Sequence, residues 1–280
     1  MRVFKTINSI GSKLSIIDKK KTLGLVPTMG ALHEGHLSIV KRAKKENDYV
    51  IVSIFVNPTQ FDKEEDLLKY PNTVKTDLKL LEDLQCDFVF MPKIEEIYAN
   101  NIVSDSFDFD NLDKAMEGAF RKGHFDGVAT IVKKLFNITH PNNAYFGEKD
   151  FQQLQIIKKM VEIESIPIQI IACEIYREDD GLAMSSRNLR LSPKQRNAAP
   201  LIYKTLLESI ELIHEKDIGF IKTFVKNNIE SNEFLELEYF EIADIETLIP
   251  ATEIIHDKKY RAFIAAFAGQ VRLIDNIALN

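Results

Sequence analysis

The distribution of apolar residues predicts alternating strands and helices in the first two thirds of the chain. Several short apolar runs are rich in β-branched and aromatic residues without polar alternation, which is typical of strands buried in a parallel sheet. Between them, apolar residues recur at helical spacing. The expected strands are residues 23–26, 49–56, 88–91, 144–146 and 166–175, and the expected helices are residues 1–21, a segment beginning near residue 37, and residues 73–84, 128–138 and 151–164. This alternation predicts an α/β fold with a parallel sheet.

The pattern changes after residue 192. Helix-patterned segments cover residues 193–231 and are followed by strand-like residues 235–242, 261–268 and 271–277. Helices grouped before strands predict a small α+β domain. We therefore expect a larger domain over residues 1–177 and a smaller one over residues 178–280.

The stretch LGLVPTMGALHEGHLSIV, residues 23–40, contains the most informative turn. Its strand is expected to end at Pro27. Gly30 and Gly35 then bracket a loop that carries His33 and leads directly to His36, at the start of a helix. Unpaired N–H groups and the helix dipole favour anions at such an end, so we expect phosphate binding there. Two alternatives remain, namely surface histidines in an ordinary turn and a zinc site, for which only Glu34 offers a nearby further ligand.

Two further expected strands end in polar residues. Asn57 and Gln60 follow residues 49–56 and could contact a ligand, although Asn57-Pro58 is also ordinary turn chemistry. The strand at residues 144–146 leads into a second glycine turn, where Lys149 could neutralise phosphate and Gln153 could bind a hydroxyl or carboxylate.

Two loops carry clustered donors. Ser185, Ser186 and Arg187 could hold phosphate oxygens, although an ordinary serine-rich turn is the simpler interpretation of this loop alone. A serine nucleophile is disfavoured because no G-x-S-x-G motif surrounds either serine. His124, in a glycine-flanked basic turn, could contact an anion or help to order a loop.

Composition narrows the function classes. A net charge of −6 and a pI of about 5.6 argue against an extended nucleic-acid interface. The chain shows neither a signal-peptide run nor an apolar stretch long enough to span a bilayer, so we expect a cytoplasmic protein with no membrane partner. Cys86 and Cys173 stand beside strand-like sequence, and we expect separate, buried, reduced thiols.

The motifs taken together resemble one family. They occur in a characteristic order, and they are PTMGALHEGH, SIFVNPTQF, the pair Tyr70-Pro71, GHFDGVATIVKKLFN, FGEKDFQQL, DGLAMSSRN and, near the end, RLIDN. This order and spacing closely resemble the pantothenate synthetases, which are AMP-forming ligases of pantoate and β-alanine. The resemblance implies a Rossmann-like, HxGH-type nucleotidyltransferase domain, a smaller C-terminal domain that closes over the site, a cytoplasmic homodimer, ATP as co-substrate and Mg²⁺.

The resemblance also implies roles for individual residues. His33, His36, Lys149 and Arg187 would be catalytic, with His36 as a proton donor. Gln60 and Gln153 would bind pantoate, Gln60 would also face β-alanine, and Asp77 would lie near Mg²⁺. The implied ATP-binding residues are Met29, Gly30, Ala31, Leu32, His33, Glu34, Gly35, His36, Gly147, Glu148, Lys149, Asp150, Tyr176, Met184, Ser185, Ser186 and Arg187.

Two positions depart from the family pattern. Asn72 stands where arginine is usual after Tyr-Pro, and Lys122 stands where proline is common. Two rival functions share the phosphate-binding motifs, namely another HxGH nucleotidyltransferase and a non-catalytic nucleotide sensor. The nucleotidyltransferase would not need an amine and would not account for the pair Gln60 and Gln153, whereas the sensor would bind ATP through the same amides but release no pyrophosphate.

Overall fold

The chain folds into two compact units, which a computed structural model describes for residues 1–62, 64–99 and 101–280. The first unit comprises Met1–Asp110, Arg121–Glu148 and Gln153–Glu174. The second comprises Asn111–Phe120, Lys149–Gln152 and Ile175–Asn280. The expected division after residue 177 into two functional domains stays a prediction.

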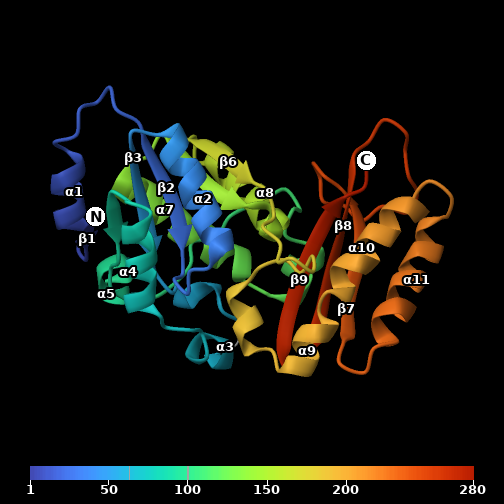
Figure 1. Cartoon of the computed structure of the whole chain (residues 1–280). Helices are drawn as coiled ribbons and strands as arrows, with labels where there is room; N and C mark the ends of the chain where they lie inside the picture. The colour runs from blue at the N-terminus through green and yellow to red at the C-terminus, as the bar shows by residue number, and fades with distance from the viewer. Residues whose placement is uncertain (63, 100) are drawn as a thin grey trace. The chain divides into compact units, whose positions relative to one another are not determined.

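A parallel sheet forms the centre of the first unit, as the apolar runs predict (Figure 1). Within the described residues its strand order is β1-β4-β3-β2-β5-β6, with every pairing parallel. The strands are β1 (Arg2–Phe4), β2 (Leu23–Thr28), β3 (Tyr49–Ile54), β4 (Phe88–Phe90), β5 (Asn143–Gly147) and β6 (Gln169–Cys173).

The strand order reverses at β2. From β2 the chain moves to β3 and β4 on one side, and it later returns to β5 on the other side. Open α/β sheets bind ligands beyond the carboxyl ends of strands at such a reversal. The residues that follow β2 and β5 are therefore in the position that this fold uses for ligands.

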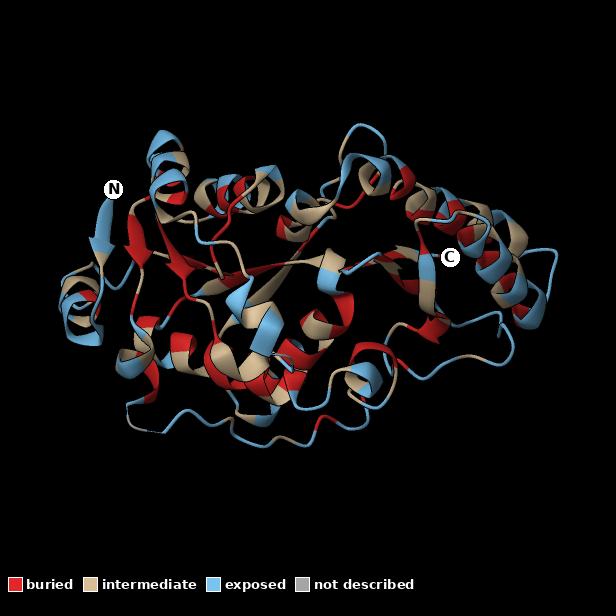
Figure 2. Ribbon diagram, turned by 90° about the horizontal axis from the view of Figure 1, so that it is seen from below, coloured by how far each residue is buried: buried red, intermediate tan, exposed pale blue. Residues whose placement is uncertain are grey.

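Helices connect and cover these strands. The described helices of the first unit are α1 (Ile7–Leu14), α2 (Glu34–Glu46), α3 (Glu64–Leu68), α4 (Val74–Asp83), α5 (Ile94–Tyr98), α7 (His124–Thr139) and most of α8 (Phe151–Ile163), with the 3₁₀ turn η1 (Pro58–Gln60). A second 3₁₀ turn, η2 (Glu148–Asp150), has its first residue in this unit and its other two in the second unit. Figure 2 shows buried residues on the strands and on inward helix faces, with exposed residues on the outer helix surfaces. Val26, Val40, Val52 and Leu81 belong to one core cluster of this sheet and its helices.

Two expectations at the start of the chain are wrong. Residues 1–21 do not form one helix, because Arg2–Phe4 pairs with Phe88–Phe90 as an edge strand before α1. Pro27 does not end β2, which stays in register with β3 as far as Thr28. Pairing of β2 with β5 stops at Leu25, and a proline is tolerated where a strand has lost one neighbour.

The second unit builds its core on an antiparallel sheet of order β7-β8-β9, counting described strands only. Its elements are α6 (Met116–Phe120), η3 (Ser186–Arg190), α9 (Pro193–Ala198), α10 (Leu201–Leu212), α11 (Ile218–Glu230), β7 (Glu236–Asp244), β8 (Tyr260–Ala268) and β9 (Val271–Ala278). Figure 1 shows α10 and α11 lying along these strands, and the two helices bury Ile202, Leu206, Ile221 and Val225 in a core with Ile264. The predicted order of helices before strands is confirmed for residues 193–277.

Candidate active site

A tight loop joins β2 to α2. Gly30 has a φ of +82° and Ala31 a φ of +51°, so the backbone turns through the left-handed region at both residues. The Thr28 hydroxyl donates to the Ser53 carbonyl and accepts from the Gly30 N–H, at 2.7 and 3.2 Å. The two adjoining strands therefore hold the loop at its start.

A buried carboxylate holds the middle of this loop. Asp77 on α4 is 1% exposed, and its two oxygens accept from the N–H groups of Ala31 and Leu32 at 3.0 and 2.9 Å. The Thr73 hydroxyl donates to the same carboxylate at 3.0 Å. Three hydrogen bonds converge on this one buried carboxyl group, so Asp77 fixes the approach to α2.

The two histidines lie at the start of α2, as predicted. His33 is the N-cap residue in extended conformation, and His36 lies one turn further on. Their half-buried rings lie against each other, with centroids 4.0 Å apart and ring planes tilted by 39°. Two imidazoles beside a helix N-terminus form a cluster suited to an anion, since the rings can donate hydrogen bonds and the helix supplies N–H groups.

Gln60 lies in η1, immediately beyond β3. Its amide nitrogen lies 3.0 Å from the Met29 sulfur, and its amide oxygen accepts from Asn57 at 3.2 Å. Asn57 is 1% exposed and also donates to the Gly127 carbonyl at 3.0 Å. Asn57 therefore orients the Gln60 side chain, and it is also the N-cap residue of the turn η1.

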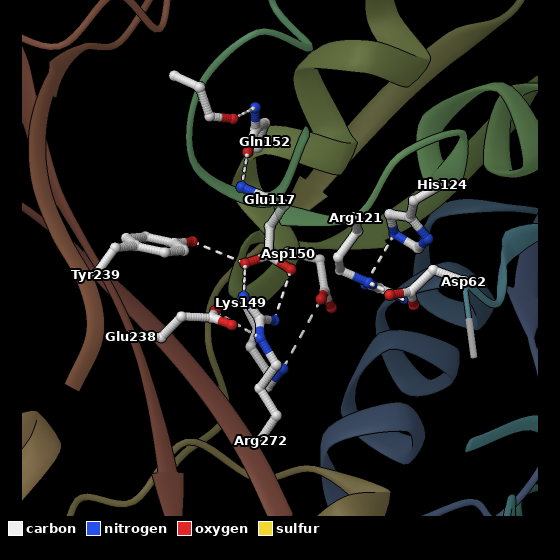
Figure 3. A network of polar contacts seen from close by, with 11 residues as sticks. Asp62, Glu117, Arg121, His124, Lys149, Asp150, Gln152, Glu238, Tyr239 and Arg272 are labelled. Carbon is white, nitrogen blue, oxygen red and sulfur yellow. Dashed lines mark hydrogen bonds and ion pairs between the residues drawn. The ribbon is translucent and has the colours of Figure 1, made fainter. Parts of the chain in front are cut away.

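A second group of side chains holds the backbone of Gln60. His124 Nδ1 lies 2.7 Å from the Gln60 carbonyl oxygen, and Arg121 donates to that same oxygen at 3.4 Å. Figure 3 shows Arg121 between His124 and Asp62, with its Nε 3.7 Å from the Asp62 carboxylate. Of the two roles considered for His124, the structure shows the loop-ordering one.

The carboxyl end of β5 leads into the predicted GEKD segment. Gly147 ends β5, and Glu148, Lys149 and Asp150 form η2 ahead of α8. The Lys149 side chain is 18% exposed, with Nζ 3.8 Å from the Asp150 carboxylate. Gln153 lies in the first turn of α8 and is half-buried. The second predicted sequence of strand, turn and helix is therefore present as β5, η2 and α8.

The predicted phosphate-binding loop of the second unit is closed by its own hydrogen bonds. The Met184 N–H donates to the Tyr176 carbonyl at 3.0 Å, and Arg177 pairs with Ala183 as an antiparallel bridge. The Ser185 hydroxyl accepts from the Arg187 N–H at 3.3 Å and caps η3. Ser186 is 7% exposed, whereas the Tyr176 side chain is 41% exposed.

The predicted site residues therefore fall into two groups, each described within its own unit. The first unit brings together the residues that follow β2 with Gln60 and Asp77, and it also contains Gly147, Glu148 and Gln153. The second unit contains Lys149, Asp150, Tyr176 and the run from Met184 to Arg187.

Among the residues that the structure describes, no preformed metal cluster accompanies these groups. Over residues 1–62, 64–99 and 101–280, no three or more His, Cys, Asp or Glu side chains are placed to hold a metal ion. Asp77 directs its oxygens at backbone N–H groups, so its present geometry is a poor fit for a direct metal ligand.

Residue motifs alone did not reveal several supporting residues. Tyr98 donates to Asn57 at 2.6 Å, and Arg177 forms an ion pair with Asp275 at 2.6 Å. Their contacts span 41 and 98 residues of sequence, so no local pattern predicts them. The string RLIDN, which contains Asp275, was the one available signal.

Comparison with known proteins gives one family. A sequence model described as pantoate-beta-alanine ligase matches residues 2–278. The chain is 54% identical over 261 residues to a pantothenate synthetase of Christiangramia forsetii, covering 93% of this chain and 92% of that protein. It is 48% identical to the pantothenate synthetase of Fervidobacterium nodosum over 284 residues and the full length of both chains.

Solved structures agree with the sequence comparison. A pantothenate synthetase from Thermus thermophilus superposes with a TM-score of 0.91 at 36% identity, covering 100% of this chain and 99% of that chain. A pantoate-beta-alanine ligase from Francisella tularensis, complexed with "Beta-gamma ATP and Beta-alanine", superposes with a TM-score of 0.82 at 36% identity over 100% of this chain and 98% of that chain. These findings confirm the predicted fold class, and the chain belongs to the pantoate-beta-alanine ligase family.

Proposed function

We propose that this enzyme condenses pantoate with β-alanine in two steps, with ATP cleaved to AMP and pyrophosphate. Family membership over residues 2–278 supports the ligase activity. The structural observation that carries the proposal is the pair His33 and His36 at the N-terminus of α2, directly beyond the strand at which the sheet order reverses. This is the position in which such sheets bind nucleotides.

The chemistry explains why ATP is needed. A carboxylate is a poor acyl donor to an amine, because an oxide ion would have to leave. Attack of a pantoate oxygen on the α-phosphorus of ATP gives a mixed anhydride, pantoyl adenylate, and releases pyrophosphate. AMP is then a stable leaving group when the β-alanine amine attacks the acyl carbon. The protein contributes mainly by positioning the reactants and neutralising charge.

In the first unit, the turn beyond β2 supplies the phosphate-binding groups. We assign the backbone of Met29 to Gly35 and the imidazole of His33 to ATP, with His36 as the proton donor. Gln60, held by Asn57 and by His124, is assigned to the hydroxyl and carboxylate groups of pantoate and to β-alanine. Gln153 is assigned to pantoate, because its amide can donate and accept at once.

In the second unit, Lys149 and the residues from Met184 to Arg187 are assigned to ATP. Lys149 is a compact charge suited to the departing pyrophosphate, and Arg187 can donate to two phosphate oxygens together. The hydroxyls of Ser185 and Ser186 add donors, and the backbone of Tyr176 is assigned to the adenine. No covalent enzyme intermediate is required in this scheme.

Mg²⁺ is proposed as the metal that accompanies ATP. It would neutralise phosphate charge when bound, but the present geometry of Asp77 fits a direct ligand poorly, so no step is derived through the ion. The assignment of Asp77 to the metal stays a prediction. Mg²⁺ commonly keeps several waters and takes its remaining ligands from substrate phosphates, which needs few protein groups.

Two properties of the whole protein are proposed from family membership. They are assembly as a homodimer and a location in the cytoplasm. Among the residues that the structure describes, no helix has the length and apolar character needed to cross a bilayer. The proposed partners are the small molecules pantoate, β-alanine and ATP.

The deciding experiment measures AMP and pyrophosphate release by the purified protein with ATP, Mg²⁺ and pantoate, with and without β-alanine. The two-step ligase predicts sustained turnover only when β-alanine is present. Turnover that is indifferent to β-alanine would indicate another nucleotidyltransferase or a hydrolase. No release under any condition would leave nucleotide binding as the function.

Two variants test the assigned residues. His36→Ala and Lys149→Ala are each expected to lower the adenylation rate by about a hundredfold or more, because each removes a group aimed at developing charge. His214→Ala is the matched control, since His214 is an exposed histidine outside the assigned set. Rates near that of the wild type would remove the tested residue from the scheme.

A further inference from the structure

The RLIDN segment, residues 272–276, lies on β9 and has no role in the function proposed above. Its side chains contact separate parts of the second unit, which is assembled from three stretches of the chain. Two of these contacts reach stretches that contain assigned ATP-binding residues. The contacts of Asn276 and Asp275 therefore bear on how those residues are held.

Asn276 contacts the backbone of Lys149. Its amide nitrogen donates to the Lys149 carbonyl at 2.9 Å, and its amide oxygen accepts from the Arg261 guanidinium. The partners fix the amide orientation, because a carbonyl can only accept and a guanidinium can only donate. Arg261 also lies over the Phe151 ring, with Cζ 4.1 Å from the ring centroid. Together, Asn276 and Arg261 hold residues on both sides of Asp150.

Asp275 holds the other ATP-binding stretch through Arg177. Arg177 donates from Nη1 and Nη2 to the two Asp275 oxygens at 2.6 and 3.0 Å, and its Nη1 also donates to the Gly181 carbonyl at 3.1 Å. The Arg177 Cζ lies 3.6 Å from the Tyr203 ring centroid. Arg177 thus spans the base of the loop that ends in Ser185, Ser186 and Arg187.

The charge balance agrees with a tightly organised group. Asp275 is 4% exposed, and burial raises the pKa of its carboxyl while Arg177, the Asn276 N–H and the Lys149 charge act in the opposite direction. A carboxylate this buried is stable only when it is paired and hydrogen-bonded. The ion pair therefore fixes the position of Arg177 rather than serving as an exchangeable surface contact.

We propose that Asn276 and Asp275 are positioning residues for ATP binding, with Asn276 fixing the backbone of Lys149 and Asp275 fixing the loop 177–187 through Arg177. Neither side chain is assigned to the nucleotide. This inference rests on the proposed function, because it takes Lys149 and the loop to be ATP-binding. Its consequence is that one strand holds both phosphate-binding stretches of the second unit.

Asn276→Asp provides the sharpest test. The carboxylate keeps the size of the side chain and an acceptor for Arg261, but it presents an oxygen to the Lys149 carbonyl where the wild type presents a donor. We expect KM for ATP to rise about tenfold while KM for β-alanine stays within about twofold, as for the loss of a group that orients a direct ligand. A purely structural role would lower the folded fraction and the apparent kcat without changing KM for ATP.

Asn228→Asp is the matched control. Asn228 is a partly buried asparagine of the same unit whose amide nitrogen donates to Thr205 and Glu208, neither of which is assigned to ATP. It should leave KM for ATP unchanged. An unchanged KM for ATP in Asn276→Asp, in a preparation whose wild type makes pantothenate, would overturn the positioning role. A wild type that releases no AMP would instead overturn the proposed function.

Hydrogen exchange gives a second test that needs no variant. In the wild-type enzyme with pantoate and Mg²⁺, a non-hydrolysable ATP analogue should slow amide exchange in residues 272–278 as well as in residues 177–187. Slower exchange in both stretches supports the proposal. Protection confined to residues 177–187 would contradict it even if Asn276→Asp failed to fold.

Discussion

At the scale of the residue, the candidate site depends on side chains that hold backbone rather than substrate. Asp77 accepts from the N–H groups of Ala31 and Leu32, and Asn57 and His124 hold Gln60. Backbone with a positive φ is costly for a residue such as Ala31, so the surrounding hydrogen bonds must stabilise it. The positions of the residues assigned to the substrates therefore depend on these supporting hydrogen bonds.

Asp77→Asn tests this dependence. The amide can accept through one atom only, so its nitrogen would face a backbone N–H of the loop. We expect the free energy of unfolding to fall by about 1–3 kcal/mol, which is typical when a buried donor loses its acceptor, and KM for ATP to rise. Chemical denaturation followed by circular dichroism, together with ATP kinetics, measures both effects.

The control for that variant lies on the same helix. Asp83 is exposed near the end of α4, and Asp83→Asn should change neither quantity. If Asp77→Asn left stability and KM for ATP unchanged but raised the Mg²⁺ concentration needed for activity, Asp77 would act on the metal and not on the loop.

The same residues show what sequence could reveal about the site. The pair His33 and His36 beside a glycine turn predicted an anion site, because both imidazoles lie within four consecutive residues. The role of Asp77 as a loop support was not predictable, because it depends on a partner 46 positions away. Local motifs identify groups that could meet a ligand, whereas the groups that hold them come from the fold.

At the scale of the element, close packing of α7 on η1 positions Gln60. Gly127 lies in α7, and a Cβ added there would come within 2.3 Å of the Thr59 carbonyl oxygen. The helix can therefore approach the turn only because this residue has no side chain. The approach brings the Gly127 carbonyl within 3.0 Å of the Asn57 amide, which in turn donates to Gln60.

Gly127→Ala is expected to destabilise the enzyme and to weaken pantoate binding. The backbone carbonyl cannot move aside as a side-chain end could, so we expect a loss of about 1–3 kcal/mol in unfolding free energy and a higher KM for pantoate. Gly11→Ala on α1 is the control, since a Cβ there meets nothing within 4 Å. Alanine is the better helix former, so this control should be neutral or slightly stabilising. Equal effects of the two substitutions would exclude the steric explanation.

A pH-dependent prediction concerns the buried thiol of Cys86, which lies in the turn between α4 and β4. Burial raises the pKa of Cys86 from an ordinary 9.0 to about 11. Between pH 9 and pH 11 the unfolded chain loses the thiol proton and the folded chain keeps it, so this group makes stability fall as pH rises above 9.

The burial of Cys86 can be tested by labelling. In the Cys173→Ala variant, which leaves one thiol, iodoacetamide at pH 8 should label Cys86 only after denaturant is added. Rapid labelling of the native protein would contradict this burial.

Element boundaries show where pattern analysis was reliable. The periodicity predicted α4, α10 and α11, because long amphipathic segments have a clear repeat. The edge strand β1 was missed, since Arg2–Phe4 is too short to show alternation and is defined by its pairing with β4. The continuation of β2 through Pro27 was also missed, because it too depends on pairing between strands. Beyond Leu25, β2 no longer pairs with β5 but stays paired with β3.

At the scale of the whole molecule, the second unit is assembled from stretches far apart in the sequence. Arg272 on β9 donates to both oxygens of Glu117 at 2.7 and 2.8 Å and to Glu238 at 2.8 Å (Figure 3). Tyr239 donates to Glu117 at 2.7 Å, and burial together with this carboxylate raises its pKa. Burial opposes the charged form of Arg272, but its hydrogen bonds to Glu117 and Glu238 outweigh that effect and raise its pKa. This cluster ties residues 111–120 to the antiparallel sheet.

Arg272→Met should therefore cost far more than the loss of an ordinary ion pair. Methionine keeps much of the side-chain volume but leaves two carboxylates largely buried without their cation, and we expect a loss of about 3–5 kcal/mol in the free energy of unfolding. Lys222→Met is the control, because the Lys222–Glu241 pair is of similar length at 2.6 Å but its side chains are 38% and 27% exposed. Exposed pairs contribute at most about 1 kcal/mol, so that variant should unfold almost as the wild type does. Urea denaturation followed by far-ultraviolet circular dichroism suits this chain, which contains no tryptophan. Similar midpoints for the two variants would mean that the buried cluster is replaceable and that apolar packing alone holds residues 111–120 in place.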